Sequence, residues 1–192
     1  MEKPIEIRWH GRAGQGVVTA GELLAEAAME EGKYFQAFPD YGPERMGAPV
    51  KSYTRISDQP IEVHYQIHTP DVVVVVNPNL IGVVDLTEGL AEKGSVLINT
   101  THSPAEVRAQ LGLAGRPVKV WTVDATRIGM ETLGRDIPST IMLGALIRAV
   151  GLIQLDTLVH LVHEKLGEKL QQRVVEANIA GLKRAYEEAV AG

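Results

Sequence analysis

The chain has 192 residues, a formal net charge of −5 and no cysteine. Its length suits one domain with a sizeable core, and a hydrophobic content of 45% is typical of a globular protein. The acidic balance, without any basic run, argues against nucleic-acid binding. Without cysteine the chain has no thiol nucleophile, disulfide or cysteine-ligated iron–sulfur cluster, so in any redox reaction another chain must carry the electrons.

Membrane and export signals are also missing from the sequence. The most apolar run, Val72 to Val76, has the length of a strand and not of a membrane span. The first residues lead directly into a predicted strand and lack the apolar region of a signal peptide. We therefore expect a single cytoplasmic domain over residues 1–192, with neither a membrane nor a nucleic acid as partner.

The first third of the chain alternates strand-like runs with one helical pattern. The pattern predicts strands at 5–9 and 34–38 and a helix over 17–31 that Gly32 ends. Residues 50–56 alternate with a period of two, which predicts an exposed or edge strand. Residues 61–67 are expected to pair with that strand through a turn at 57–60.

The rest of the chain follows the same alternation and then becomes helical. The run 71–76 is nearly pure valine, which predicts a central parallel strand, and Pro78 is expected to open a helix that reaches Glu92. Further elements are predicted as strands at 96–99 and 118–123, a capped helix from Ser103, and helices at 141–149, 155–166 and 170–189. The predicted fold is α/β and Rossmann-like, with a mainly parallel sheet, helices on both faces and a C-terminal helical pair.

A glycine loop between the first strand and the first helix is the main candidate site. Gly11, Gly14 and Gly16 have the spacing G-x-x-G-x-G, whereas dinucleotide-binding folds need G-x-G-x-x-G. Such a loop directs backbone N–H groups and a helix N-terminus at an anion, and Arg12 and Gln15 add further donors. The alternative is a tight turn that binds nothing.

The acidic residue that dinucleotide folds use for the ribose has one candidate, Asp40. It follows the second predicted strand, but its neighbours Pro39 and Gly42 suit a turn equally well. One alternative function therefore stays open, a free-standing nucleotide- or phosphate-binding Rossmann-like module without a redox centre. The spacing of the glycines opposes an NAD or FAD enzyme.

A second candidate site is the long loop over 37–49, which is rich in glycine and proline and carries aromatic and charged residues. Loops of this length after a strand are usually functional. We expect a docking or ligand loop in which Arg45 meets a carboxylate or phosphate, although Glu44 and Arg45 also fit an exposed charge pair. The candidate interface or ligand residues are Pro43, Glu44, Arg45, Gly47, Ala48 and Pro49.

Polar residues also follow the strands. His10 is the histidine best placed for a ligand, whereas Asn77 and Asn99 fit helix capping better than ligand binding. No nucleophile–base pair, G-x-S-x-G elbow or set of metal ligands is visible. The sequence therefore predicts no catalytic residue and no metal site in this chain.

Several of these segments together resemble the gamma subunit of pyruvate/2-oxoacid:ferredoxin oxidoreductases. The combination of the glycine loop with the Pro-Glu-Arg loop is specific, and the resemblance spans nearly the whole chain. One departure is Asn77, where the family commonly has aspartate. The segments that carry the resemblance are 7–17, 37–39, 42–50, 55–58, 70–74, 137–145 and 178–186.

The resemblance implies a multi-subunit enzyme that oxidatively decarboxylates a 2-oxoacid, reduces ferredoxin and makes acyl-CoA. Thiamine diphosphate with Mg is expected on the alpha and beta subunits, and iron–sulfur clusters on the beta and delta subunits. The gamma chain would bind no redox cofactor, pack beside the thiamine site and hold coenzyme A through its glycine loop. The Pro-Glu-Arg-x-Gly-Ala-Pro form resembles the pyruvate branch, whose product is acetyl-CoA.

Overall fold

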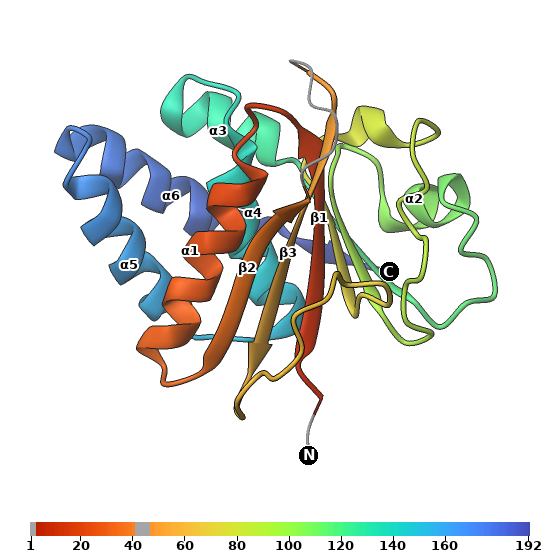
Figure 1. Cartoon of the computed structure of the whole chain (residues 1–192). Coiled ribbons are helices and arrows are strands. Elements are labelled where there is room, and N and C mark those ends of the chain that lie inside the picture. The colour runs from red at the N-terminus through yellow and green to blue at the C-terminus, as the bar shows by residue number, and fades with distance from the viewer. Residues whose placement is uncertain (1–2, 41–46) are drawn as a thin grey trace.

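The computed structural model describes residues 3–40 and 47–192 (Figure 1). Within these residues, seven strands form one sheet in the order β2-β3-β1-β4-β5-β6-β7. The strands are β1 (Ile5–Arg12), β2 (Tyr34–Asp40), β3 (Pro49–Ser57), β4 (Val72–Val75), β5 (Ser95–Asn99), β6 (Lys119–Val123) and β7 (Val190–Ala191). The helices are α1 (Val17–Glu30), α2 (Pro104–Gln110), α3 (Ala125–Leu133), α4 (Pro138–Val150), α5 (Leu155–Gly167), α6 (Gln172–Glu188) and a short 3₁₀ helix, η1 (Pro78–Leu80).

The α/β fold is as predicted, and the prediction of a mainly parallel sheet is correct in part, because the sheet is mixed. Strands β1, β4, β5 and β6 are parallel to one another, whereas β2, β3 and β7 pair antiparallel with their neighbours. The chain between β2 and β3 is too short for the crossover that a parallel pair requires, so these two strands must run in opposite directions. The parallel part of the sheet therefore consists of β1, β4, β5 and β6.

Strand β3 was expected at an edge, and this expectation is wrong. It lies between β2 and β1, and its alternating polar residues are buried and paired. Thr54 Oγ1 accepts a hydrogen bond of 3.1 Å from the Trp9 indole, and Ser52 donates one of 3.1 Å to the carbonyl of Val17. On the other face, the buried guanidinium of Arg55 pairs with Glu6 at 2.8 Å. Because its buried polar residues find partners inside the fold, β3 has the same alternating sequence pattern as an exposed strand.

Two further local predictions are wrong. Residues 61–67 form no strand, and the helix expected from Pro78 is limited to η1. Gly82 and Gly89 have φ angles of +77° and +66°, which end helical geometry. A side chain at Gly89 would also collide with the carbonyl of His68, so the segment after η1 turns repeatedly against the sheet.

The sheet separates two apolar layers, as Figure 1 shows with α1, α4, α5 and α6 on one side and α2 on the other. The valine strand supplies both layers, because successive side chains point to opposite faces. Val72 and Val74 belong to the larger cluster, and Val73 and Val75 belong to the smaller one. The prediction of a central parallel strand buried on both faces is confirmed.

The C-terminal helical pair, α5 and α6, is also confirmed. Helix α6 packs closely on α4 at Gly144, where an added Cβ would collide with the carbonyl of Leu182. After α6 the chain returns to the sheet, and β7 pairs with β6 as an antiparallel edge strand that the sequence did not predict. In the described part of the chain, no helix combines the length and apolarity that crossing a membrane requires.

Candidate functional site

The carboxyl ends of the four parallel strands lie along one edge of the sheet. After β1 the chain passes through α1 toward β2 and β3, whereas after β4 it proceeds toward β5 and β6. The direction of the connections therefore changes between β1 and β4, and open α/β sheets bind ligands in the crevice at such a point. The glycine loop follows β1 at this position, and Asn77 follows β4.

The three glycines of the loop have different physical roles. Gly14 and Gly16 have φ angles of +89° and +73°, a region that other residues rarely adopt. A Cβ on Gly16 would lie 2.7 Å from Ser139 Oγ, and a Cβ on Gly11 would lie 2.5 Å from a methyl group of Val17. Around Gly14, by contrast, no described residue lies within 4 Å of an added Cβ. The loop is thus tightly packed at its two ends and open at its middle glycine.

Two polar side chains hold this loop in place. The Gln15 side-chain oxygen accepts a hydrogen bond of 2.8 Å from the Arg12 backbone N–H and one of 3.1 Å from Asn77 Nδ2. The Arg12 guanidinium donates to the carbonyl of Gly47 at 2.8 Å. Both residues therefore make structural bonds within the site, and their contact with an anion stays a prediction.

The two loops that the sequence singled out meet at this site. The backbone N–H of Ala13 donates to the carbonyl of Ala48 at 3.1 Å, and Arg12 lies opposite Pro49 in the β1–β3 register. Gly47, with a φ angle of +80°, is the first described residue after the gap. Pro43, Glu44 and Arg45 lie outside the described residues.

The N-terminus of α1 differs from those of the other helices that follow parallel strands. Its N-cap residue is Gly16, so no side chain caps the first N–H groups, and its first turn has no acidic residue. A side-chain cap needs an extended N-cap residue, which the left-handed φ angle of Gly16 excludes. Among the described residues, the start of α1 therefore has no side-chain cap, and it carries the positive end of the helix dipole.

A hollow of about 410 Å³ lies at this end of α1. The charged residues that line it, Arg12 and Lys51, are both cations. Gly14 and the first turn of α1 form one wall, and the ends of β2 and β3 form the other. Its lining residues are Arg12, Ala13, Gly14, Gly16, Val17, Val18, Thr19, Pro39, Val50 and Lys51. Backbone donors, a helix N-terminus and cationic residues together suit a phosphate or carboxylate.

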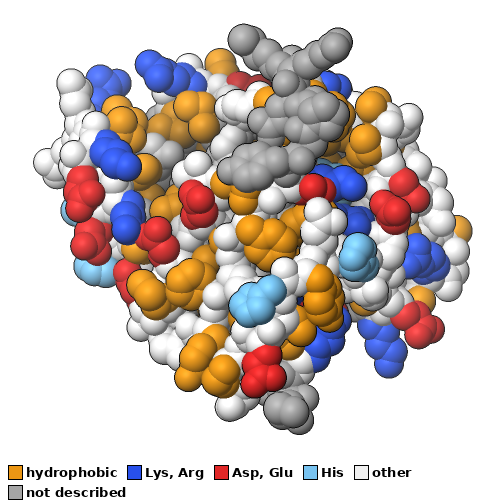
Figure 2. All heavy atoms as spheres, viewed as in Figure 1, with side chains coloured by type: hydrophobic (Ala, Val, Ile, Leu, Met, Phe, Trp, Pro, Cys, Tyr) orange, Lys and Arg blue, Asp and Glu red, His pale blue; other side chains and the backbone are white. Residues whose placement is uncertain are grey.

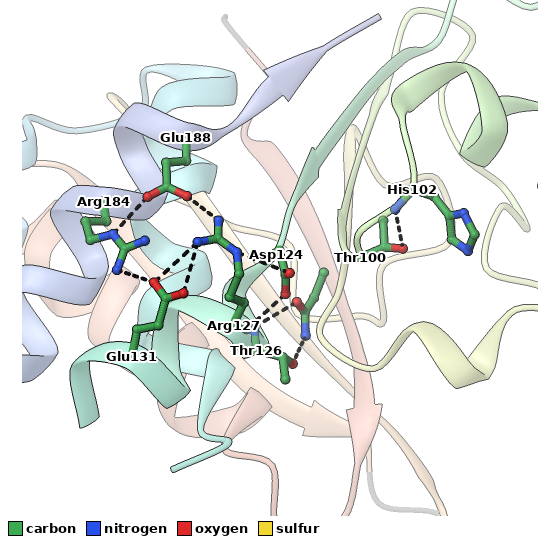
Figure 3. Close-up of polar contacts among 9 residues, drawn as sticks. Thr100, His102, Asp124, Thr126, Arg127, Glu131, Arg184 and Glu188 are labelled. Carbon is green, nitrogen blue, oxygen red and sulfur yellow. Dashed lines mark hydrogen bonds and ion pairs between the residues drawn. The ribbon is translucent and has the colours of Figure 1, made fainter. Parts of the chain in front are cut away.

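At the carboxyl ends of β4, β5 and β6 the corresponding donors are already occupied. Ser103 and Glu106 form a complete capping box on α2, and Asp124 accepts from the N–H of Arg127 at the start of α3 (Figure 3). Asn77 caps η1 through the N–H of Asn79, which confirms the capping interpretation. A hollow of about 650 Å³ near Thr100 and His102 thus lies beside helix ends that are closed by their own side chains.

Asn99 caps the first turn of α3 from the neighbouring strand, as the capping interpretation expects, and it also binds the end of β4. Its side-chain N–H₂ donates to the carbonyl of Val76 at 3.0 Å and to the hydroxyl of Thr126 at 2.9 Å. Its oxygen accepts from the N–H of Thr126 at 3.2 Å. The residue therefore ties β5 to the end of β4 and to the first turn of α3.

His10 is not available for the ligand contact that its position suggested. The ring is buried, and its Nε2 accepts a hydrogen bond of 3.0 Å from Arg8 Nε. Burial, followed by the positive charges of Arg8 and Lys51, lowers the pKa of His10 to about 3. The ring is therefore neutral at physiological pH and serves as an acceptor for a buried arginine.

Asp40 does not occupy the position of a ribose-binding acid. It ends β2, which is separated from β1 by β3. Its carboxylate accepts hydrogen bonds from the Tyr53 hydroxyl at 3.1 Å and from Gln66 at 3.2 Å. Burial, together with the Asp40 charge, raises the pKa of Tyr53 to about 12. Both this geometry and the glycine spacing argue against a dinucleotide site.

Metal ligands are not grouped in the described residues. Across residues 3–40 and 47–192, no three histidine, aspartate or glutamate side chains are placed together to hold a metal ion. The site therefore consists of backbone donors, cationic residues and amides.

The chain matches the family model described as pyruvate ferredoxin/flavodoxin oxidoreductase over residues 6–188. The chain belongs to this family. The resemblance found in the sequence is thereby confirmed, and the alternative of a free-standing nucleotide-binding module is not favoured.

Curated relatives match along their full length. The chain is 46% identical to the pyruvate synthase subunit PorC of Thermotoga maritima over 97% of this chain and 95% of the relative. It is 46% identical to the common gamma subunit of the pyruvate/ketoisovalerate oxidoreductases of Pyrococcus furiosus, over 95% and 96% of the two chains. The crystal structure of the PORC subunit from Thermotoga maritima has a TM-score of 0.87, with 42% identity over 100% and 99% of the two chains.

Sequence reasoning missed two residues at this site. Lys51 was assigned only to an alternating strand, and Ser139 lies before the helix predicted at 141–149, in a segment used only for the family resemblance. The β1–β3 register brings Lys51 opposite His10, and the packing of α4 brings Ser139 against Gly16. Both depend on contacts between segments far apart in the sequence, for which the local pattern carries no signal.

Proposed function

We propose that this chain is the gamma subunit of a 2-oxoacid:ferredoxin oxidoreductase and that the oxoacid is pyruvate. The complex oxidatively decarboxylates the oxoacid to acyl-CoA, acetyl-CoA for pyruvate, and passes the electrons to ferredoxin. The observation that carries the proposal is the 46% identity to a pyruvate synthase subunit along the full length of both chains. The PorC crystal structure supports it, because the same fold extends over the whole of this chain.

The partners in this proposal are alpha, beta and delta subunits, with thiamine diphosphate, Mg and iron–sulfur clusters on those chains. The absence of cysteine from this chain supports such a division, since thiolates are the usual ligands of iron–sulfur clusters. The Pyrococcus furiosus relative is named as a subunit common to two oxidoreductases. That name supports an arrangement in which other subunits select the oxoacid.

Assembly would use the exposed apolar side chains of this chain. Strand β2 is a seven-residue edge of the sheet, and Tyr34 and Phe35 on it are 48% and 37% exposed. Tyr65 is 60% exposed. Figure 2 shows apolar side chains distributed between charged ones on the face viewed in Figure 1. Exposed aromatic side chains are typical of surfaces that bind other proteins.

Within the complex, the hollow at α1 is proposed to hold phosphate groups of coenzyme A. The residues fit an anionic group, because the first turn of α1 is uncapped and Arg12 and Lys51 are the charged residues of the lining. Open space beside Gly14 lets a phosphate approach the backbone closely. The contact residues in this proposal are Gly11, Arg12, Gly14, Gln15 and Gly16, with the loop from Pro43 to Pro49 as the docking segment.

The first experiment is an affinity purification of this chain from its host under anaerobic conditions, followed by mass spectrometry and cofactor analysis. We expect larger chains to co-purify with thiamine diphosphate and iron–sulfur clusters, and the complex to oxidise pyruvate with CoA and ferredoxin. Recovery of this chain alone would contradict the proposal.

The role of the glycine loop is tested by Gly14→Val in the assembled complex. The variant places a branched side chain in the open space and strains a positive-φ position, so we expect weaker use of CoA or weaker subunit docking. The control is Gly32→Val, because Gly32 has a φ angle of +74° and equally open surroundings but lies at the other end of α1. An unchanged KM for CoA with intact assembly would contradict the CoA contact.

A further inference from the structure

We propose that Gln15 and Asn77 form a brace that sets the shape of the glycine loop from the end of the neighbouring strand β4, and that Gln15, besides its proposed contact with the anion, thereby positions the loop backbone around it. That the ligand is an anion rests on the proposed function, whereas the brace itself depends only on contacts within this chain. It is carried by two hydrogen bonds to one oxygen, 2.8 Å from the Arg12 N–H and 3.1 Å from Asn77 Nδ2.

The brace joins two segments that are separate in the sequence. Gln15 lies in the loop after β1, and Asn77 lies two residues after the end of β4, on the other side of the point where the connections change direction. The loop is therefore held between β1 and β4 by an amide oxygen.

Asn77 determines which end of the Gln15 amide faces the loop. Its own oxygen accepts from the N–H of Asn79 at 3.0 Å, so its N–H₂ group is directed at Gln15. A donor at this position requires an acceptor opposite it, which turns the Gln15 oxygen inward. That same oxygen then satisfies the Arg12 N–H, which a flipped amide would leave facing another donor.

The sharpest variant is Asn77→Asp. It keeps an oxygen for the N–H of Asn79 but replaces the donor to Gln15 by a second acceptor. Either the two oxygens repel each other, or the Gln15 amide turns and the Arg12 N–H loses its partner. We expect amide hydrogen exchange in residues 11–16 of the full chain to become faster by about tenfold, as for the loss of one buried hydrogen bond.

Two substitutions at Gln15 separate the brace from the binding site. Gln15→Met removes both hydrogen bonds at nearly constant volume, so loop exchange and the KM for CoA of the assembled complex should both rise while kcat is retained. Gln15→Glu keeps an oxygen for both donors, so loop exchange should stay as in the wild type. Its negative charge should still raise the KM for CoA, because the ligand is an anion.

The matched control is Gln172→Met, which removes an exposed amide that pairs only with Glu176 on α6. This variant should change neither the hydrogen exchange of the glycine loop nor the KM for CoA. Wild-type exchange rates in both Gln15→Met and Asn77→Asp would overturn the brace. Faster exchange with an unchanged KM would uphold the brace and contradict the CoA contact in the proposed function, so the two ideas fail separately.

Discussion

The end of β1 and the ends of β5 and β6 lie on the same edge of one sheet, but their helices begin in different ways. Helices α2 and α3 begin at Ser103 and Asp124, whose side chains occupy the first N–H groups. Helix α1 begins at a left-handed glycine, where no side-chain cap is present. Among the described residues, the fold thus closes the starts of α2 and α3 with their own side chains and leaves the start of α1 without a side-chain cap.

The closed side is also joined by ion pairs. Figure 3 shows Arg127 between Asp124, Glu131 and Glu188, with Arg184 contacting both glutamates. These contacts link α3 to α6 near the point where the chain turns into β7. Among the described residues that line the hollow at the α1 end, the charged side chains are Arg12 and Lys51, and no comparable set of carboxylates is described there.

At neutral pH, the largest expected effect comes from Gly16→Ala. The left-handed φ angle costs about 1–2 kcal/mol for a residue with a Cβ, and crowding against Ser139 adds about 1 kcal/mol. Gly32→Ala, with a φ angle of +74° and open surroundings, should show the strain alone. Chemical denaturation measures the free energy of unfolding of both variants.

The double variant Gly16→Ala/Ser139→Ala should regain the stability that Gly16→Ala loses to crowding, so that it is destabilised only as much as Gly32→Ala. If Gly16→Ala and Gly32→Ala cost the same, Ser139 does not confine the start of α1 and the contrast between the two helix ends loses this support.

The next effect concerns His10, which lies one residue before the glycine loop. Its folded pKa of about 3 is below the usual 6.5, so on acidification the unfolded chain takes up a proton that the folded chain refuses. The free energy of unfolding should therefore fall by about 1.4 kcal/mol for each pH unit below 6.5, until the pH reaches about 3.

His10→Gln keeps an acceptor for Arg8 but does not titrate, so its stability should depend less on pH, as denaturation between pH 4 and pH 7 would measure. His160→Gln, on the exposed surface of α5, is the control. If the stabilities of wild type and His10→Gln depended equally on pH, His10 would titrate normally and would be available to bind a ligand at the N-terminus of α1.

A smaller effect is expected from Ser103→Ala on the closed side. The variant removes the hydroxyl that caps α2, and the loss of such a cap destabilises a protein by about 1 kcal/mol. Thermal unfolding of the full chain checks it, while the KM for CoA in the complex should stay unchanged. An altered KM would show that the closed end also contacts the ligand.

The smallest effect is expected from Arg184→Gln in the ion-pair network of Figure 3. These pairs are partly exposed, so water and salt weaken them. The stability difference from the wild type should be smaller than that of Ser103→Ala and should shrink further in high salt. A larger, salt-independent loss would mean that the network holds β7 in place.

Much of the fold could be predicted because its signals are local. The alternation of strands and helices, the buried valine strand and the capping box at Ser103 all depend on residues close together in the sequence. The failures have long-range causes. Strand β3 resembled an edge strand because Ser52 and Thr54 find buried partners on α1 and on Trp9. The helix expected after Pro78 yields to turns at Gly82 and Gly89, while Leu80, Leu86 and Leu90 of the same segment pack against the sheet.

Local sequence was sufficient for the glycine loop, the absence of thiol chemistry and the family resemblance, because glycine spacing and residue composition need no partner segment. That the two predicted loops touch, through Arg12 and Ala13 with Gly47 and Ala48, follows from the packing of the folded chain. The tertiary structure also turned the Gln15 side chain toward Asn77 and placed His10 in the interior. It paired the Asp40 carboxylate with the hydroxyl of Tyr53. Hydrogen bonds between distant segments form only once the sheet order brings those segments together, so no local pattern contains them.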